Sequence, residues 1–388
     1  MRLYDTAKSA YVIFQPKKIV GIYVCGITPY DSAHLGHIFT FMTYDLLQRR
    51  LEDLGHQVNM VRNITDVDEP IYERARRLGI AYTDLAEKEI VSFHSTLERL
   101  NFRPLYAEPR ASEYIDDMAL AVDKLLAKNI AYKVGKDIYF DTAKYPDFVC
   151  FSGFNDRLIN GLFKVRGGDP DRKGKHHKLD FLLWKSVDDQ SDPAHWDSVL
   201  GIGRPGWHIE CSVMSSSTLG VPFDIHGGGT DLIFPHHSAE LVQGQGLGFS
   251  QLAHNWIHVS PLLSDGEKMS KSLGNLVFAK DLLNDYEPAV IRMALMQYHH
   301  RIGGEWQPEL LVGAEQLLKA VRRQSAKCDQ HTASTLLDKI RLSLDDDINT
   351  LEVMDVLKDF AAAKPAPKKT SPATFKIIDR ALSLIGLQ

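Results

Sequence analysis

The stretch "VCGITPYDSAHLGH" (24–37) joins a β-branched segment to a segment with helical periodicity. The residues "KKIVGIYVCG" (17–26) before the turn predict a buried strand that ends at a glycine. Apolar residues then recur at helical spacing, at Leu35, Phe39, Met42, Leu46 and Leu54. A second predicted strand, "HQVNMVRNIT" (56–65), completes a strand–helix–strand unit, which implies a parallel sheet. We therefore expect an α/β fold with ligands bound beyond the carboxyl ends of its strands.

Patterns farther along the chain predict that this unit is one half of a larger catalytic domain. Residues 69–128 have helical patterns, residues 131–206 are rich in turns, and "VPFDIHGGGTD" (221–231) and "NWIHVS" (255–260) predict two more strands. From residue 285 the pattern is helical, interrupted by a predicted exposed linker at 361–372. The predicted domains are a Rossmann-like catalytic domain in two halves (1–130 and 201–284), a connective insertion (131–200) and a helical bundle (285–388).

The composition is that of an ordinary soluble globular protein. The 388 residues are 44% hydrophobic and 24% charged, and the net charge of -5 gives no overall positive field for nucleic acid. The charged N-terminus does not resemble a signal peptide, and no apolar run reaches the roughly 18 residues of a membrane span. Four scattered cysteines do not suggest a disulfide framework. We expect a cytoplasmic monomer with reduced thiols and with no membrane or nucleic-acid partner.

Two short motifs predict a phosphate-binding site. In "HLGH", His34 and His37 lie on one face of a helix's first turn, near the positive end of its dipole, where a nucleotide phosphate would bind. In "DGEKMSKSLGN" (265–275), Lys268 and Lys271 flank a flexible loop that could neutralise charge in a transition state. Each motif alone is also compatible with ordinary polar surface residues. Together, in this order, they resemble the two signature motifs of class I aminoacyl-tRNA synthetases, and that resemblance implies ATP chemistry.

Cysteine and histidine side chains predict a metal site. The segment "GWHIECS" contains Cys211, and "IFPHHSAE" contains His236, His237 and Glu240. Together with Cys25, the residues Cys211 and His236 would offer zinc two thiolates and one imidazole, with a position left open for a substrate. Glu240 could complete the coordination, whereas His237 fits a supporting role better. Because these residues are far apart in sequence, a set of buried core residues is the alternative interpretation.

With these motifs the chain resembles the cysteinyl-tRNA synthetase group of class I aminoacyl-tRNA synthetases over nearly its whole length. Within that group it is most similar to the cysteine ligases of mycothiol biosynthesis, which join L-cysteine to the amine of glucosaminyl-inositol. That similarity depends on "CGITPYD" in place of a "CGPTVYD" form, on "DVDEP", and on "RGGDPDRKGK". The end of the chain at residue 388 leads us to expect no anticodon-reading domain. His226 and Glu240 instead match the tRNA enzymes, and Val165 replaces a glutamate of the ligase pattern.

The resemblance implies a reaction and assigns roles to individual residues. The implied reaction is ATP-dependent ligation of L-cysteine to glucosaminyl-inositol through a cysteinyl-adenylate, with release of AMP and pyrophosphate and with Mg²⁺ accompanying ATP. Catalytic roles at the phosphates would fall to His34, His37, Lys268 and Lys271. One zinc ion per chain would be bound by Cys25, Cys211 and His236, with Glu240 as the candidate fourth ligand. The residues lining the adenylate pocket would be Cys25, Gly26, Ile27, Thr28, Thr40, Asn63, Ile64, Thr65, Trp207, Gly229, Thr230, Asp231 and Leu262.

Three points stay open: the identity of the general base, the acceptor, and whether the protein is catalytic. The general base that the acceptor amine needs could be Asp231 or a histidine near the zinc. A compact cysteinyl-tRNA synthetase would share every catalytic motif and differ only in its acceptor. A non-catalytic relative that binds zinc or a nucleotide would also keep these residues. The expected small-molecule substrates are ATP, L-cysteine and glucosaminyl-inositol.

Overall fold

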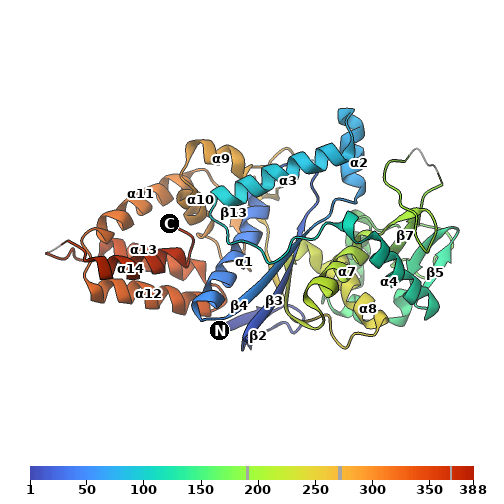
Figure 1. Cartoon of the computed structure of the whole chain (residues 1–388), viewed down its shortest axis with the longest axis horizontal. Coiled ribbons are helices and arrows are strands. Elements are labelled where there is room, and N and C mark those ends of the chain that lie inside the picture. The colour runs from blue at the N-terminus through green and yellow to red at the C-terminus, as the bar shows by residue number, and fades with distance from the viewer. Residues whose placement is uncertain (189–191, 270–272, 368) are drawn as a thin grey trace.

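The computed structural model describes residues 1–188, 192–269, 273–367 and 369–388. The molecule is elongated, with a parallel sheet in the middle, the C-terminal helices at one end and residues 131–205 at the other (Figure 1). Within the described residues, every helix is too short or too polar to cross a membrane. The central sheet is therefore enclosed between two parts of the chain that differ in architecture.

Four parallel strands form the central sheet, in the order β10–β9–β3–β4. They are β3 (Ile19–Ile27), β4 (Gln57–Ile64), β9 (Phe223–Gly229) and β10 (Ala253–Val259). Tyr23 of β3 pairs with Val61 of β4 on one side and with His226 of β9 on the other. Strands from the two predicted halves of the domain are thus neighbours, and the predicted α/β fold with a parallel sheet is confirmed.

Helix α1 (Leu35–Asp53) follows β3 and is buried on almost all sides, because it lies between the sheet and the C-terminal helices. The apolar residues that predicted this helix are in the core, except Leu54, which follows the last helical residue and is 43% exposed. Asp45, in the middle of α1, accepts a hydrogen bond from Arg49 at 2.9 Å and one from Arg292 at 2.5 Å. Since Arg292 belongs to the C-terminal half, this buried ion-pair network joins that half to α1.

Helices α2 (Glu69–Leu78), α3 (Tyr82–Arg99) and α4 (Ile115–Ala127) occupy most of the segment that was predicted to be helical. The prediction is wrong between α3 and α4, where the chain runs beside β4 before a short 3₁₀ turn at Ala111–Glu113. Single parallel bridges join Val61 to Ala107 and Ile64 to Arg110. Prolines in this stretch disfavour a helix, and the extended chain covers the exposed edge of the sheet.

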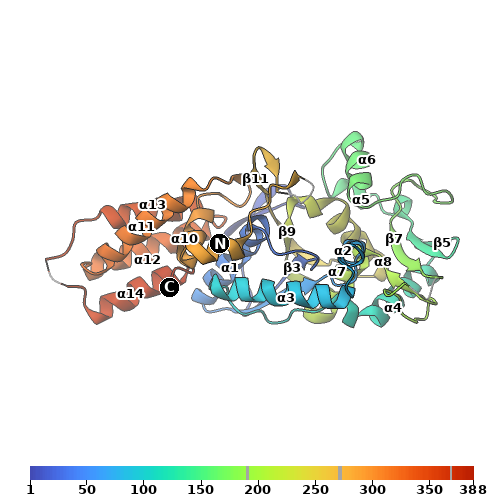
Figure 2. The ribbon, with the colours of Figure 1, turned by 90° about the horizontal axis from the view of Figure 1, so that it is seen from above.

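The predicted turn-rich insertion contains a second sheet, which the sequence did not predict. Its four antiparallel strands are β5 (Ala131–Val134), β6 (Asp137–Phe140), β7 (Leu182–Ser186) and β8 (Gly203–Pro205). Strands of three to five residues carry too little periodicity to be recognised. A 3₁₀ turn (Thr142–Lys144) and helices α5 (Asp147–Cys150) and α6 (Asp156–Val165) connect β6 to β7. Figure 2 shows α5 and α6 on the same side of the molecule as β11.

The remaining elements complete the catalytic half and the bundle. Helices α7 (Trp207–Leu219) and α8 (Ser238–Leu247) lie on either side of β9 in sequence, and α7 also contacts β3 and β4. The small strands are β1 (Arg2–Asp5), β2 (Ala10–Ile13), β11 (Leu262–Ser264), β12 (Glu267–Lys268) and β13 (Gly304–Glu305). The C-terminal helices are α9 (Ala279–Asp285), α10 (Pro288–Leu295), α11 (Glu309–Ser325), α12 (Gln330–Asp345), α13 (Thr350–Ala362) and α14 (Pro372–Ser383). The predicted linker coincides with the connection between α13 and α14.

Candidate active site

A pocket with a volume of about 430 Å³ lies where β3 and β9 end. It brings together many of the residues expected from the sequence, namely Cys25, Gly26, Thr28, His34, His37, Thr40, Trp207, Gly229, Asp231, Leu262 and Lys268. Sequence reasoning missed other residues of its lining, among them Tyr30, Phe41, Leu232 and Met269. Because the two strands come from separate halves of the domain, the pocket has the position at which parallel α/β sheets bind ligands.

Several predicted site residues lie outside the lining of this pocket. Ile27 and Ile64 are buried in the hydrophobic core, since alternate residues of a strand face opposite sides of the sheet. Asn63 supports a residue of the lining and does not line the pocket itself. Its side-chain oxygen accepts a hydrogen bond from the Gly26 amide at 2.9 Å, and its side-chain amide donates one to Thr65. The remaining members of this set are Thr65, Cys211, Thr230, His236 and Glu240. Lys271 lies outside the described residues.

The glycine that ends the predicted first strand is required by the close approach of two strands. A Cβ atom on Gly26 would lie 1.6 Å from the carbonyl oxygen of Asn63, so a side chain cannot be accommodated there. The amide of Gly26 is at the same time held by the Asn63 side chain. This packing fixes Cys25 at the end of β3, next to the pocket.

The two histidines of "HLGH" lie side by side at the start of α1. His34 is the N-cap, and its Nδ1 accepts a hydrogen bond from the Gly36 amide at 3.1 Å. The ring centroids of His34 and His37 are 3.9 Å apart. Burial lowers the pKa of His34 to about 2 and that of His37 to about 4. Both rings are therefore neutral near pH 7, and they can offer hydrogen bonds to a phosphate without carrying a charge.

Lys268 reaches the pocket from the other half of the domain. It belongs to β12, and its Nζ is 2.7 Å from a carboxylate oxygen of Asp231. Burial alone would raise the pKa of Asp231, but the ammonium of Lys268 lowers it below its usual value. The pair places a lysine cation in the same pocket as His34 and His37, and such a group can offset the charge of a bound phosphate.

Cys25, Cys211, His236 and Glu240 come together although four separate elements carry them. Cys25 lies near the end of β3, Cys211 is on α7, His236 is in a π-helical turn (Ile233–His237), and Glu240 is on α8. One ligand atom from each residue lies within 4.8 Å of all the others. The two sulfur atoms are 3.7 Å apart, Cys25 Sγ is 3.8 Å from Glu240 Oε1, and His236 Nε2 is 3.2 Å from the same oxygen.

These spacings fit a tetrahedral zinc ion. Zinc–ligand bonds of about 2.0–2.3 Å require ligand atoms about 3.3–3.8 Å apart, which is the edge of the corresponding tetrahedron. The three measured separations, 3.2, 3.7 and 3.8 Å, agree with that edge. Two thiols, an imidazole and a carboxylate are also a donor set that suits zinc better than harder cations. In the free protein, burial raises the pKa of the Cys25 thiol, and a bound cation would reverse this effect.

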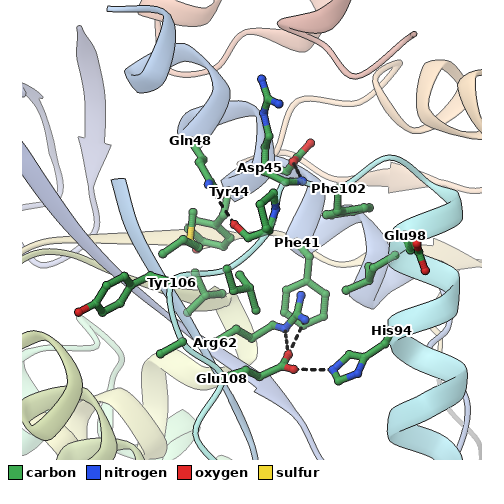
Figure 3. Close-up of a pocket in the computed structure, with 17 residues that line it drawn as sticks. Phe41, Tyr44, Asp45, Gln48, Arg62, His94, Glu98, Phe102, Tyr106 and Glu108 are labelled. Carbon is green, nitrogen blue, oxygen red and sulfur yellow. Dashed lines mark hydrogen bonds and ion pairs between the residues drawn. The ribbon is translucent and has the colours of Figure 1, made fainter. Parts of the chain in front are cut away.

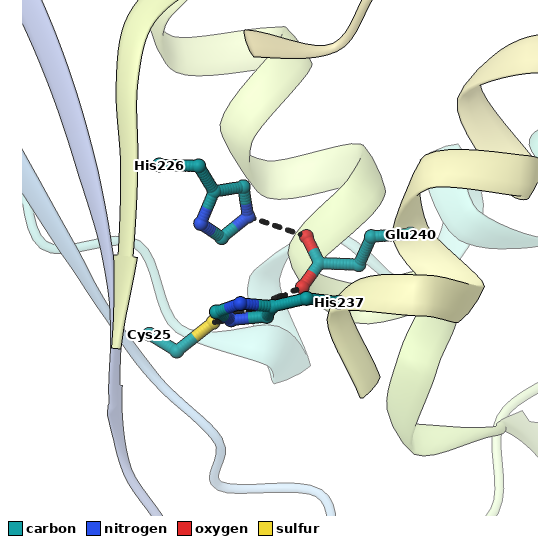
Figure 4. A group of neighbouring side chains, drawn as sticks. All are labelled: Cys25, His226, His237 and Glu240. Carbon is teal, nitrogen blue, oxygen red and sulfur yellow. Dashed lines mark hydrogen bonds and ion pairs between the residues drawn. The ribbon is translucent and has the colours of Figure 1, made fainter. Parts of the chain in front are cut away.

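An overlapping group shares two residues with this cluster and adds two histidines (Figure 4). His226 Nε2 is 2.8 Å from Glu240 Oε2, and His237 Nε2 is 3.2 Å from Cys25 Sγ. His237 is bonded in turn through Nδ1 to His258 at 2.7 Å. We interpret His226 and His237 as supporting residues, because they contact Glu240 and Cys25 and contribute no second thiol.

The ligand histidine of the first group is oriented by its own neighbours. His208 Nδ1 is 3.0 Å from His236 Nδ1, and the Trp207 ring stacks on His236 with centroids 4.3 Å apart. Arg166 donates a hydrogen bond to the carbonyl of Phe234, in the same turn as His236. This contact gives the "RGGDP" element a structural role, whereas Val165 is 83% exposed. Sequence reasoning missed His208 and His258, although both lie in segments that it quoted.

A separate cavity of about 570 Å³ lies among α1, β4 and α3 and is lined by aromatic and paired charged residues (Figure 3). Arg62 Nε donates to Glu108 at 3.0 Å, and His94 bonds to the other oxygen of Glu108. Phe41 lines both this cavity and the active-site pocket. The charged groups that Figure 3 labels near Phe41 are Arg62, His94 and Glu108, and they are bonded to one another. This cavity is therefore a weaker candidate for an active site than the first pocket.

Comparison with known proteins identifies the family. Residues 12–316 match the model for the tRNA synthetases class I (C) catalytic domain. An L-cysteine:1D-myo-inositol 2-amino-2-deoxy-alpha-D-glucopyranoside ligase of Thermobispora bispora is 40% identical over 364 residues, which are 94% of this chain and 90% of that protein. A ligase 2 of the same name from Corynebacterium jeikeium is 42% identical over 379 residues, covering 93% of this chain and 89% of that one.

Solved structures agree on the fold. The methionyl-tRNA synthetase of Mycobacterium tuberculosis in complex with methionyl-adenylate superposes with a TM-score of 0.66 at 15% identity, over 95% of this chain and 89% of that one. The agnB2 LeuRS of Agrobacterium radiobacter K84, in a ternary complex with tRNA and LeuAMS, gives 0.65 at 10% identity, over 96% and 83%. The chain therefore belongs to the class I (C) tRNA synthetase catalytic-domain family, and within it to the group of L-cysteine:1D-myo-inositol 2-amino-2-deoxy-alpha-D-glucopyranoside ligases.

Proposed function

We propose that this protein catalyses the ATP-dependent ligation of L-cysteine to the amine of glucosaminyl-inositol through a cysteinyl-adenylate. The observation that carries the proposal is the junction of two sites in one pocket. Cys25, a member of the thiol–histidine cluster, lines the same pocket as His34, His37 and Lys268. A cysteine bound at the cluster would thus present its carboxylate to ATP bound between the histidines and the lysine. The names of the relatives support the choice of acceptor.

Recognition of the amino acid would depend on its sulfur. A zinc ion held by Cys25, Cys211 and His236, with Glu240 as a fourth ligand only when no substrate is bound, would supply a Lewis acid for the thiolate of substrate cysteine. Trp207, which stacks on His236 and lines the pocket, would form a wall of the amino-acid site. Serine would bind poorly, because its hydroxyl is a much weaker zinc ligand than a thiolate. A pocket that selects by size alone would discriminate between serine and cysteine by only about 1–3 kcal/mol.

The first half-reaction would join the cysteine carboxylate to the α-phosphate of ATP, with pyrophosphate as the leaving group and Mg²⁺ accompanying ATP. His34 and His37 would donate hydrogen bonds to phosphate oxygens, together with the backbone amides at the start of α1. Lys268 would leave Asp231 and offset charge on the leaving group. We include Lys271 in the same role on the strength of the sequence motif.

The second half-reaction would form the amide bond. The acceptor amine attacks the carbonyl carbon of the adenylate, AMP leaves, and the nitrogen loses a proton to a base. Asp231 is a poor base as long as it is paired with Lys268. The buried histidines at and beside the cluster are also unsuited, because His236 is bonded to His208 and His237 is bonded to His258.

The experiment that tests the proposal supplies purified protein with ATP, cysteine and one acceptor at a time, and identifies the product by mass. With glucosaminyl-inositol we expect a cysteinyl amide together with AMP and pyrophosphate. Charging of a cysteine tRNA under the same conditions, without ligation to the amino sugar, would favour a compact cysteinyl-tRNA synthetase. Absence of cysteine-dependent pyrophosphate exchange would favour a non-catalytic relative.

A further inference from the structure

A second pocket, with a volume of about 870 Å³, adjoins the active-site pocket. The two share the lining residues Thr28, Tyr30, Trp207, Asp231, Leu232 and Lys268. The second pocket extends from them between the β4–α2 turn on one side and α6 with β7 on the other. Its volume suits a ligand of disaccharide size. A ligand there would meet an adenylate at the shared residues.

Most charged groups of this second pocket already have ion-pair partners. Glu69 is bonded to Lys185 at 2.6 Å and also to Arg204. Asp169 is bonded to Lys175 at 2.9 Å. These pairs are fixed walls of the pocket, and they offer polar atoms to the hydroxyl groups of a ligand.

Asp68 is different, because no cation among the described residues lies within ion-pair distance of it. Its Oδ1 accepts the Glu69 amide at 2.9 Å as the N-cap of α2. Its Oδ2 accepts a hydrogen bond from the Thr28 hydroxyl at 3.5 Å, which is long for such a bond. Since Thr28 belongs to both pockets, this carboxylate oxygen lies at their junction.

The surroundings of Asp68 prepare it to take up a proton near neutral pH. Burial raises its pKa to about 6, the nearby Glu69 adds to this rise, and Arg204 opposes it. The other titratable groups that face it are Tyr30, Tyr72 and Glu210. A base with a pKa near the working pH is the most effective general base. Asp231, in contrast, is held as a carboxylate by Lys268.

We propose that the second pocket binds the acceptor, a polyhydroxylated amine, and that Asp68 accepts the proton which the amine loses when it attacks the adenylate. This inference rests on the proposed function. In the step, the nitrogen lone pair forms the bond to the carbonyl carbon, and the bond from that carbon to the phosphate oxygen breaks. AMP leaves with the electron pair, and the proton passes from nitrogen to Asp68 Oδ2.

The test is the Asp68→Asn variant, which keeps the shape of the side chain and its capping ability. We expect cysteine-dependent ATP–pyrophosphate exchange to stay within about twofold of wild type and ligation to glucosaminyl-inositol to fall about 10²–10⁴-fold. Hydroxylamine is a weakly basic amine, so its nitrogen is acidic enough after attack to lose its proton to water, and formation of cysteinyl hydroxamate should change little. The matched control is Asp329→Asn, which makes the same change at the exposed N-cap of α12 and should alter neither reaction.

Each other outcome has a distinct meaning. Ligation by Asp68→Asn at the wild-type rate, or an equal loss of exchange and ligation, would overturn the role of Asp68. Failure of the wild-type protein to ligate glucosaminyl-inositol, with exchange intact, would overturn the proposed acceptor and this inference with it. If the wild-type protein ligates the amino sugar, the proposed function is supported. A failed prediction for Asp68→Asn would then concern the role of Asp68 alone.

Discussion

The active-site cluster and a group in the C-terminal half, His299, His300 and Asp347, both bring potential ligand atoms within 4.8 Å of one another. The first group contains two thiols, whereas the second contains none. In the second group the carboxylate is already satisfied, because Asp347 accepts hydrogen bonds from Arg301 at 2.5 Å and from the Tyr4 amide at 2.8 Å. A guanidinium at this position repels a second cation. Proximity of ligand atoms is therefore insufficient, and the donor chemistry and the local charge separate a metal site from a buried polar network.

The largest expected effect comes from removing a thiol of the first cluster. Cys211→Ala should lose the bound zinc, and cysteine-dependent pyrophosphate exchange should fall by more than the roughly 10–100-fold that loss of a supporting residue costs. Metal analysis after dialysis and the exchange assay measure the two effects. His300→Gln, in the second group, is the control and should keep both zinc and activity. A full zinc content in Cys211→Ala would break the comparison.

The Lys268→Ala variant tests whether the Lys268 cation, near the first cluster, acts on ATP and not on the metal. Lys268 pairs with Asp231, which is not a member of the cluster. We expect adenylate formation to slow by about 10²–10³-fold, the loss typical of one electrostatic contact to a transition state. Zinc content and the KM for cysteine should stay near wild type. A large rise in that KM with unchanged turnover would contradict the assigned role.

Acid should destabilise the protein through its buried histidines. Burial lowers the pKa of His37 to about 4 and those of His208 and His258 to about 3. Each binds fewer protons when folded than when unfolded, where its pKa is about 6.5, so its stabilisation is present above that pH and is lost as the pH falls. We expect Tm to decrease steadily from pH 6.5 to pH 4. His300→Gln should keep most of this decrease, because His37, His208 and His258 lie outside the second group, and a flat profile would contradict this assignment.

A substitution in the second group should have the smallest effect on activity, although it should lower stability. Arg301→Met leaves Asp347 buried without its strongest partner and should lower the free energy of unfolding by about 2–3 kcal/mol, after allowance for the partial exposure of Arg301. Urea denaturation measures this loss. Zinc content should stay at its wild-type value, because the second group lacks thiols. A second zinc ion in the variant would mean that Arg301 alone had excluded a metal there.

Local patterns were sufficient to predict the elements that carry the catalytic motifs. The β-branched run before Cys25 and the helical spacing after His34 predict β3 and α1, because burial on both faces of a parallel sheet requires such residues. The four-stranded sheet at 131–205 was missed, since its short strands are stabilised by their partners and not by their own periodicity. The extended stretch beside β4 was missed for a related reason. Its conformation depends on the exposed edge of the sheet that it covers.

The chemical groups of the site can be read from the sequence alone, because "HLGH", the lysine loop and the cysteine and histidine residues are present whatever the fold. Which of these groups meet depends on the tertiary structure. It brings Cys25, Cys211, His236 and Glu240 to spacings that fit a tetrahedron and places His226 and His237 in supporting contacts. It also places Asp68 beside a second pocket, with no cation of the described residues at ion-pair distance. The physical reason is that metal geometry and proton affinity depend on distances and burial between residues remote in sequence, which local patterns do not encode.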